Sequence, residues 1–444
     1  MDMIIAFIIF MGTMITCIVT GTQVMIALVT GLVCFLIVGI RRGFTLREVS
    51  TFALRGSKDS LVVIYVMLLI GLITAIWRSS GTITAFVYYG IKVITPSMFI
   101  FVTFILASIL AYALGTSFGV VGTVGVIFMA LARSGGVNEI LTAGAIMSGI
   151  YFGDRTGPAS SSGNLVAIIT GTKMQKNVRA MLKTGALPMV ISGILYYFLS
   201  INNPIKGVDA QVLGAFKDEF VINYWLFIPA ILMIVLPLLR VDVMISLSAS
   251  ILAGAVITVV IQGNTLMETI NYAVFGYTAK NAALTTILSG GGIISMIEVC
   301  GIVIISCAYS GLFNNTNMLS QIQSELKSKA KYIGRFGAML VVSTVSCMVF
   351  CNQTVASMMC NDLLAKPYEE AGATKEELAI DIENSVIVIA GLVPWCLACS
   401  FPLKAMGVGI NALPFSFFVY LMPICYAFTK KIWYNKKDID QKEI

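Results

Sequence analysis

Apolar stretches long enough to cross a lipid bilayer follow one another along almost the whole chain. A spanning helix needs about 20 apolar residues. Eight uninterrupted stretches approach or exceed that length: 3–20, 22–40, 59–77, 185–200, 222–239, 242–262, 281–308 and 412–429. Only 11% of the 444 residues are charged, whereas soluble domains carry about 25%. These features predict an all-α polytopic membrane protein, because helices satisfy their own backbone hydrogen bonds in lipid.

Two longer apolar stretches have polar residues at mid-length. The stretch 97–132 is interrupted by "GTS" (Gly115–Ser117), and 336–365 is interrupted by "NQT" (Asn352–Thr354). Both are too long for one crossing. We expect each stretch to form a re-entrant hairpin, in which one helix enters the membrane, a polar tip reverses the chain and a second helix returns. Such hairpins are tolerated at membrane depth only where protein or a water cavity satisfies the backbone hydrogen-bonding groups.

Two other spans, 139–171 and 378–401, are interrupted by proline. In the first, "GDRTGPASSSGN" begins at Gly153 and contains Pro158 and two more glycines. Proline and clustered glycine oppose a regular helix, so we expect this span to divide into two half-helices. At a shift of 237 residues its first part falls opposite "AGLVPW" (Ala390–Trp395) in the second span. With the eight uninterrupted stretches, ten spans are expected.

Basic residues set the predicted orientation, because Lys and Arg are enriched in cytoplasmic loops. They gather in four groups: Arg41–Arg42, Lys173–Lys183, Lys327–Arg335 and Lys430–Lys437. Placing all four inside predicts a cell-membrane protein with both termini cytoplasmic. The first hairpin then enters from outside and the second from inside. No basic stripe stands outside the spans, so a nucleic-acid partner is not expected.

The two halves of the chain share sequence features in the same order. "TLREVSTFALRG" (45–56) matches "TLMETINYAVFG" (265–276), and "GTS" falls opposite "NQT". An odd number of spans per half inverts the second half, and inverted repeats with broken helices are typical of secondary transporters. The expected divisions are a first repeat (1–203), an extracellular linker (204–221), a second repeat (222–430) and a cytoplasmic basic tail (431–444).

Breaks and hairpin tips supply candidate ligands for an ion, because a broken helix presents free carbonyl and N–H groups. Asp154 is the candidate carboxylate for a cation and a proton, and Na⁺ is the expected ion, with Asn352 and Thr354 as further ligands. The other candidate binding residues are Gly115, Thr116, Ser117, Thr156, Ser160, Ser161, Ser162, Asn164, Gln353 and Pro394. Packing through small residues is the alternative for the first tip. We expect both breaks and both tips to converge on one central cavity.

Several charged residues allow more than one interpretation. Arg155 contacts a substrate carboxylate, makes a structural ion pair within the broken helix, or lies at the membrane interface and reaches water. Glu298 either carries protons or is a hydrogen-bonded structural acid. We expect Glu383 at a solvated helix start, Asp362 in the inner vestibule and Arg78 as an interfacial anchor.

Other chemistries are disfavoured. The chain has no His, which removes conventional hydrolase triads, and no phosphate-binding loop of the ATPase type. We therefore expect no enzyme activity and no cofactor.

At these motifs the sequence resembles the NhaC family of sodium/proton antiporters. The resemblance rests on "GTSFGVVGT" (115–123), "GDRTGPASSSGNLVA" (153–167) and "EN" with "PW" at 383–384 and 394–395. It implies Na⁺/H⁺ antiport by alternating access. Ser161 stands where the family usually has a second acid. That departure, with Arg155, favours the alternative, cation-coupled movement of a small organic acid or amino acid. The plain spans 1–40 and 222–262 suit a scaffold and a homodimer interface in the lipid bilayer.

Overall fold

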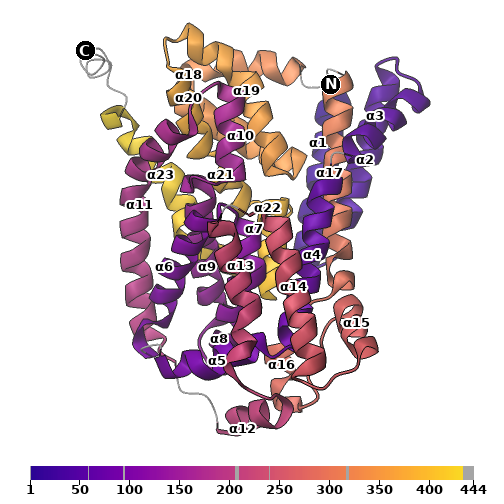
Figure 1. The fold of residues 1–444 in the computed structure, drawn as a ribbon. Helices are drawn as coiled ribbons and strands as arrows, with labels where there is room; N and C mark the ends of the chain where they lie inside the picture. Colours follow the sequence, from indigo (N-terminus) through magenta and orange to yellow (C-terminus); the bar gives the residue numbers. More distant parts are fainter. Residues whose placement is uncertain are drawn as a thin grey trace. The chain divides into compact units, whose positions relative to one another are not determined.

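The computed structural model describes residues 2–58, 60–93, 96–205, 210–239, 241–316 and 320–433 (Figure 1). Within these ranges the regular elements are helices, and one isolated bridge joins Tyr277 and Gly290. This confirms the all-α fold class. Most of the predicted tail 431–444, and the side chains of the basic group at 327–331, lie outside the described part.

Many of the described helices are long and apolar enough to cross a membrane. Six do so alone: Asp2–Thr20, Val24–Arg41, Ser117–Ser134, Met174–Asn202, Val243–Val260 and Ile293–Phe313. Three bent pairs raise the count over the described residues to nine: Leu46–Lys58 with Val63–Ser79, Leu213–Glu219 with Tyr224–Leu238, and Lys375–Leu392 with Leu397–Met406. The protein is a multi-pass membrane protein. The total of ten spans stays a prediction.

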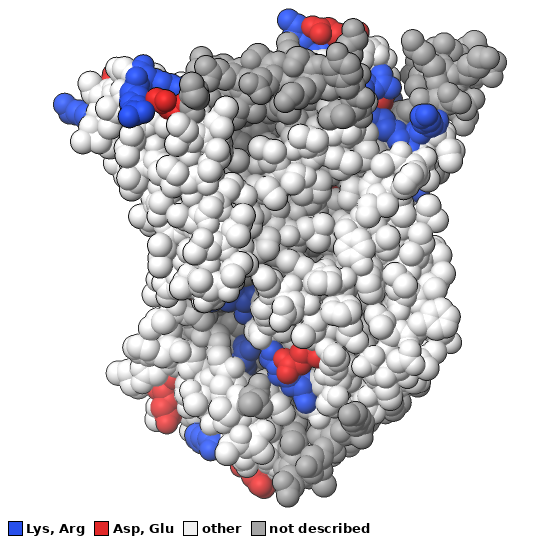
Figure 2. Space-filling view, turned by 180° about the vertical axis from the view of Figure 1, so that it is seen from behind, with Lys and Arg blue, Asp and Glu red and all other residues white. Residues whose placement is uncertain are grey.

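The surface agrees with this assignment. Most of the face in Figure 2 carries neither basic nor acidic side chains, and the charged ones gather in a few groups. Large apolar side chains such as Ile8, Phe198 and Leu252 are exposed on three of the long helices. Exposed apolar side chains on spanning helices are what contact with lipid requires.

The chain forms two compact units, each of which draws on both halves of the sequence. Unit 1 comprises Met1–Tyr65 and Ile297–Ser400, and unit 2 comprises Val66–Met296 and Phe401–Ile444. These units describe packing. The division into repeats at residues 203 and 222 concerns internal similarity and stays a prediction.

Unit 1 holds the first three helices and a later group. They are α1 (Asp2–Thr20), α2 (Val24–Arg41), α3 (Leu46–Lys58), α17 (Ile297–Thr316), α18 (Ser320–Phe350), α19 (Gln353–Glu370), α20 (Lys375–Glu383), α21 (Val386–Ile389) and η6 (Ala390–Leu392). Two helices cross the unit boundaries: α4 (Leu61–Ser79) and α22 (Leu397–Met406).

Unit 2 holds most of the remaining helices. Its first part contains α5 (Thr82–Val93), η1 (Pro96–Met98), α6 (Phe99–Leu114), α7 (Ser117–Val120), the π-helical η2 (Val121–Gly125), α8 (Val126–Ser134), α9 (Glu139–Thr156), α10 (Ser161–Thr170) and α11 (Met174–Asn202). Its second part contains α12 (Ala210–Glu219), η3 (Tyr224–Phe227), α13 (Ile228–Leu238), α14 (Val243–Val260), α15 (Leu266–Phe275), η4 (Ala282–Leu284), α16 (Thr285–Leu288), η5 (Ile293–Met296), η7 (Ile410–Phe415) and α23 (Phe417–Trp433).

In unit 1, α1, α2, α3 and α17 pack side by side (Figure 1). An aromatic cluster joins α2 to α17: the Phe35 ring lies 5.1 Å from Tyr309 and 4.8 Å from Phe313. The Tyr309 hydroxyl donates to the Leu28 carbonyl, which satisfies a buried phenol. This bundle is held by aromatic packing and by a close contact between glycines.

Glycines allow α3 and α17 to touch backbone to backbone. A methyl group added at Gly311 would lie 2.3 Å from the Phe52 carbonyl oxygen, and one added at Gly56 would lie 2.3 Å from the Cys307 carbonyl oxygen. Small residues at such crossings let membrane helices approach closely and gain van der Waals contact.

In unit 2, α9 packs against α6 through glycines spaced four residues apart. A methyl group added at Gly149 would lie 2.7 Å from the Ala107 methyl, and one added at Gly153 would lie 2.2 Å from the Ala111 methyl. A spacing of four places both glycines on one helix face. Gly153, expected to help break the span, is instead helical, because the close contact with α6 requires a residue without a side chain.

The stretch 281–308, expected as one span, is not a single helix. Its first part consists of short turns and three consecutive glycines, Gly290–Gly292, with φ of 124°, 79° and 87°. Positive φ is incompatible with a right-handed helix. The Gly292 N–H donates to the Gly71 carbonyl at 2.8 Å, so this segment packs on α4, and the long helix α17 begins only at Ile297.

Local structure recurs in the two halves at a constant distance. α6 ends at Leu114 and α18 ends at Phe350, 236 residues later. Five further pairs of helix ends keep the same distance: Ser117 and Gln353, Ser134 and Glu370, Glu139 and Lys375, Ser161 and Leu397, and Thr170 and Met406. The sequence alignment at 237 was therefore wrong by one residue, because it matched the polar letters of "GTS" and "NQT". The structural distance places Pro158 opposite Pro394.

Capping also recurs between the halves. The Thr265 hydroxyl caps the Glu268 N–H of α15 at 3.2 Å, and the Glu268 carboxylate accepts from the Thr265 N–H at 2.7 Å. At the start of α3 the Thr45 hydroxyl accepts from the Glu48 N–H at 3.3 Å, and the Glu48 carboxylate accepts from the Thr45 N–H at 2.8 Å. The matching "TLREV" and "TLMET" sequences therefore encode the same capping box. The inversion of the second half stays a prediction.

The glycine contact between α3 and α17 predicts a stability difference. Gly311→Ala should lower the free energy of unfolding by about 1–3 kcal/mol, because the new methyl overlaps backbone that cannot move independently. Gly12→Ala is the matched control, since nothing lies within 4 Å of an added methyl there and alanine favours a helix by about 1 kcal/mol. Thermal unfolding in detergent measures both. Equal melting temperatures would contradict the contact.

Candidate functional site

The span 139–171 breaks between two half-helices, as predicted. α9 ends at Thr156, four residues follow, and α10 begins at Ser161. The Ser160 hydroxyl caps α10 by accepting from the Gly163 N–H at 3.0 Å. A serine N-cap satisfies a donor that the start of a helix leaves open, so the polar sequence after Pro158 encodes a new helix start.

Asp154 lies in the last turn of α9 and is only 4% exposed. Its backbone carbonyl accepts hydrogen bonds from the hydroxyls of Ser160 and Ser162, the latter at 3.0 Å. The two hydroxyls are 2.8 Å apart. Two of the predicted oxygen ligands therefore gather at the backbone of the predicted carboxylate, beside the break.

The other predicted residues of this stretch lie in different surroundings. Thr156 is buried and its hydroxyl donates to the Phe152 carbonyl at 2.5 Å. Asn164 donates to the Ser160 carbonyl at 2.7 Å. Ser161, the position of the missing second acid, is exposed. The break thus uses some of its polar groups to hold its own shape.

Arg155 is fully buried against α11. Its Nη2 donates to the Met181 carbonyl at 2.9 Å and to the Thr184 hydroxyl at 2.7 Å. An added methyl at Gly185 would lie 2.7 Å from Nη1. These bonds fix the end of α9 to α11, and the alternative roles of Arg155 stay predictions.

The tip of the first hairpin touches this break. Gly115 has φ 65° and ends α6, and Thr116 caps α7 by accepting from the Gly119 N–H at 3.3 Å. A methyl added at Gly115 would lie 2.4 Å from the Ala159 carbonyl carbon and 2.6 Å from the Ser160 nitrogen. Within unit 2, therefore, a predicted tip and a predicted break form one polar cluster.

The second hairpin and the second break meet in the same way within unit 1. Cys351 has φ 53° at the tip, and the Asn352 side chain caps α19 by accepting from the Thr354 N–H at 2.9 Å. The Leu397 N–H, which opens α22 after the break at Val393–Cys396, donates to the Cys351 carbonyl at 2.8 Å.

Two further bonds tie this hairpin to the chain around Pro394. Gln353 donates to the Ile387 carbonyl at 3.1 Å, and the Trp395 indole donates to the Met348 carbonyl at 2.8 Å. The bend between Lys375–Leu392 and Leu397–Met406 is 49°. Each hairpin tip thus contacts the broken helix of its own half, and convergence of the two halves on one cavity stays a prediction.

Three acids differ from expectation or were overlooked. Glu383 is fully buried at the end of α20, so the expected solvated helix start was wrong. Glu377 and Asp381, which were not singled out, are also buried in α20: Arg335 pairs with Glu377 at 3.1 Å, and the Tyr368 hydroxyl donates to Asp381 at 2.6 Å. The spacing of Glu377, Asp381 and Asn384 puts them on one helix face, and that pattern was the available signal.

Glu298 and Asp362 lie less deeply than these acids. Glu298 is half-buried in the first turn of α17, because the span that was expected around it starts later. Asp362 is exposed on α19. Their predicted roles, in carrying protons and lining a vestibule, stay predictions.

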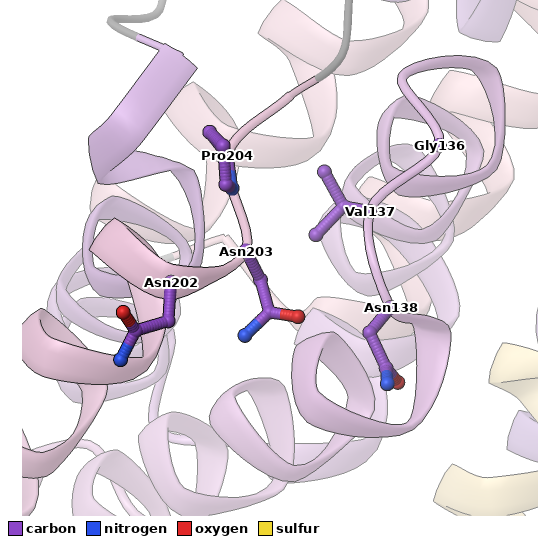
Figure 3. Close-up of a pocket in the computed structure, with 6 residues that line it drawn as sticks. All are labelled: Gly136, Val137, Asn138, Asn202, Asn203 and Pro204. Atoms are coloured by element: carbon purple, nitrogen blue, oxygen red, sulfur yellow. The ribbon is translucent and has the colours of Figure 1, made fainter.

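A cavity of about 340 Å³ lies elsewhere in unit 2, where α8 turns into α9 and α11 ends (Figure 3). It is lined by Gly136, Val137, Asn138, Asn202, Asn203 and Pro204. None of the predicted site residues lines it.

The family model of Na⁺/H⁺ antiporters matches residues 2–163 and 149–431. The chain belongs to this family. Its resemblance to NhaC is thereby confirmed, and the protein is a secondary active antiporter. It is 29% identical over 420 residues to the malate-2H⁺/Na⁺-lactate antiporter of Bacillus subtilis, covering 92% of this chain and 90% of that protein.

Two further relatives carry different names. The Na⁺/H⁺ antiporter NhaC of Alkalihalophilus pseudofirmus is 26% identical over 83% of this chain and 81% of its own length. The arginine/ornithine antiporter ArcD of Halobacterium salinarum is 25% identical over 83% of this chain and 79% of its own length. Relatives at similar identity therefore differ in the solutes that their names state.

The contact between hairpin tip and break predicts a functional effect. Gly115→Ala should abolish transport, because a side chain at φ 65° would also overlap the Ala159 backbone. Gly21→Ala is the matched control: φ is 68° there and nothing lies within 4 Å of the added methyl, so it carries the strain of positive φ alone. Solute uptake by proteoliposomes measures the difference, and equal loss in both variants would show that the tip contact is not required.

Proposed function

We propose that this antiporter exchanges Na⁺ for H⁺ by alternating access, with Asp154 as the carboxylate for which the two ions compete. The observation that carries the proposal is the burial of Asp154 at a helix break that a re-entrant tip contacts. An acid buried in a membrane span is a functional residue by default, and broken helices at the midplane form the ion sites of many secondary transporters.

Competition follows from the chemistry of one carboxyl group. Na⁺ requires the ionised form, because an oxygen with a negative charge attracts a hard cation most strongly. A proton neutralises the same group and removes that attraction. Each conformational cycle can then carry one kind of ion in each direction, which couples the two gradients without a further energy source.

Neutral oxygens complete the proposed site. On the first half we assign Gly115, Thr116, Ser117, Thr156, Ser160, Ser161, Ser162 and Asn164 as its ligands or lining. On the second half we assign Asn352, Gln353, Thr354 and Pro394, with Asn352 and Thr354 as Na⁺ ligands. Glu298 is a second candidate proton carrier. Convergence of both sets requires the two halves to be inverted repeats.

The membrane context belongs to the same proposal. We infer a cell-membrane location with both termini cytoplasmic, from the four basic groups in the sequence. The plain apolar spans 1–40 and 222–262 supply a scaffold and a homodimer interface. The partners are then lipid, a second copy of the chain and the transported solutes, without a cofactor or an enzymatic step.

The proposal predicts that Asp154→Asn abolishes Na⁺-driven proton movement in proteoliposomes containing a pH-sensitive dye, while the melting temperature stays close to that of the wild type. Asp242→Asn is the matched control. Asp242 caps α14 by accepting from the Met244 N–H at 2.8 Å, and asparagine caps equally well, so transport should persist. Wild-type turnover by Asp154→Asn would refute the assignment.

A second function is favoured by one position. Ser161 replaces the second acid that the resemblance leads one to expect, and the malate-2H⁺/Na⁺-lactate antiporter is 29% identical to this chain. One carboxylate less weakens binding of a bare cation. The alternative is therefore Na⁺- or H⁺-coupled exchange of a small organic acid or amino acid.

The same proteoliposomes distinguish the two functions. Na⁺/H⁺ antiport predicts that a Na⁺ gradient alone moves protons. Organic-solute exchange predicts no proton movement until malate, lactate or an amino acid is supplied on one side. The Asp154→Asn variant should be inactive in either case, so it identifies the site independently of the solute.

A further inference from the structure

Arg78 lies in a site that the antiport proposal does not use. It was expected to anchor the end of α4 at the membrane interface, but it is only 6% exposed. The single hydrogen bond recorded for it runs from Nη1 to the Thr74 carbonyl on its own helix, at 2.6 Å. Its Nε is buried and has no hydrogen-bond partner among the described residues.

The bonding pattern leaves one particular edge of the guanidinium available. Nη1 donates to the Thr74 carbonyl, whereas no residue in the described part of the chain accepts a hydrogen bond from the edge formed by Nε and Nη2. That edge presents two parallel N–H donors, which match the two oxygens of a carboxylate. A buried charge without a counter-charge destabilises the folded protein. An anion bound at this edge would therefore be stabilising.

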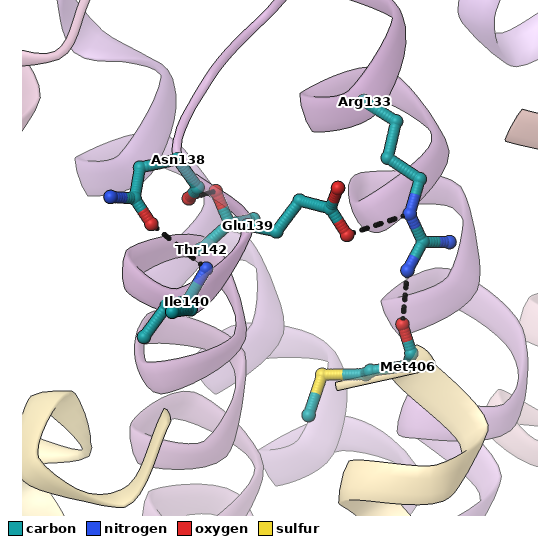
Figure 4. A network of polar contacts seen from close by, with 6 residues as sticks. All are labelled: Arg133, Asn138, Glu139, Ile140, Thr142 and Met406. Atoms are coloured by element: carbon teal, nitrogen blue, oxygen red, sulfur yellow. Dashed lines mark hydrogen bonds and ion pairs between the residues drawn. The ribbon is translucent and has the colours of Figure 1, made fainter. Parts of the chain in front are cut away.

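A second positive charge lies near Arg78. Arg133 of α8 lies close enough to act on it electrostatically. Arg133 is itself engaged: Nε pairs with Glu139 at 2.8 Å and Nη2 donates to the Met406 carbonyl at 2.7 Å (Figure 4). Glu139 thus compensates Arg133 directly, and no ion pair of Arg78 is found among the described residues.

The helix that carries Arg78 contacts the first hairpin. Ile70 lies on α4 two turns before Arg78, and its side chain contacts Gly122. A methyl group added at Gly122 would lie 2.4 Å from the Ile70 Cγ2 atom. Gly122 belongs to the first hairpin. The Arg133 and Glu139 side chains are 17% and 43% exposed, and the cavity of about 340 Å³ lies at the same turn between α8 and α9.

We propose that Arg78, supported by Arg133, binds a small carboxylate-bearing anion. The carboxylate takes the Nε–Nη2 edge of Arg78, and Arg133 adds positive potential. Binding there would bias the first hairpin through its contact with α4. The inference rests on the proposed function only in treating the protein as a transporter, because anion binding needs no Na⁺/H⁺ exchange.

Thermal unfolding of the purified full-length protein in detergent tests the proposal, with succinate as probe and chloride as the simple anion for comparison. A ligand that binds the folded state raises the melting temperature with its concentration. Succinate should do so, and chloride should not at the same ionic strength. Arg78→Gln should remove the shift. Arg78→Lys keeps the charge but not the planar fork, so the apparent affinity should fall roughly tenfold or more.

Arg47→Gln is the matched control, because Arg47 is an exposed arginine on α3 and its loss changes the net charge equally. It should keep the succinate shift. The proposal is overturned by a wild type that does not respond to succinate, by an equal response to chloride, or by an Arg78→Gln variant that keeps the shift. If Arg78→Gln does not fold, undiminished affinity in Arg78→Lys overturns it as well. Na⁺-driven proton movement, measured separately, reports on Asp154 and not on this site.

Discussion

The contact between each re-entrant tip and the helix break of its own half is the constraint on which the proposed mechanism depends. In unit 2, Gly115 lies against the backbone of Ala159 and Ser160 so closely that a methyl group would overlap it. In unit 1, the Leu397 N–H donates to the Cys351 carbonyl. A break ends the internal hydrogen bonding of a helix, and in lipid the freed groups need partners. The tips supply protein at those points, so tip and break are expected to move together.

The two halves reach this contact with different residues. The first tip uses glycine at positive φ, which costs little, whereas the second uses Cys351 at φ 53°. At the first break a serine caps the new helix, and after the second break the Leu397 N–H donates to the Cys351 carbonyl at the tip. The acids are distributed unevenly between the two halves: the position 236 residues after Asp154 is Ala390. The architecture is repeated, while the chemistry is concentrated in particular positions.

Much of this arrangement follows from the sequence, because breaks and tips have local causes. Pro158 and Pro394 mark both breaks, and "GTS" and "NQT" mark both tips. What the sequence could not supply is tertiary packing. Gly153 looked like a helix breaker but serves the contact with α6, the buried hydrogen bonds of Arg155 to α11 could not be read from its neighbours in the chain, and the glycines at 290–292 turn a predicted span into a packed loop. In each case the decisive partner is distant in the chain.

Competition between Na⁺ and a proton at Asp154 can be tested directly on the purified protein. Na⁺ binding is measured at several pH values, and proton release is recorded in the same titration. Competition requires that each Na⁺ bound releases up to one proton and that, in the pH range where the site is protonated, the apparent Kd rises about tenfold per unit of decreasing pH. Binding of Na⁺ with the same affinity at every pH, without proton release, would contradict it.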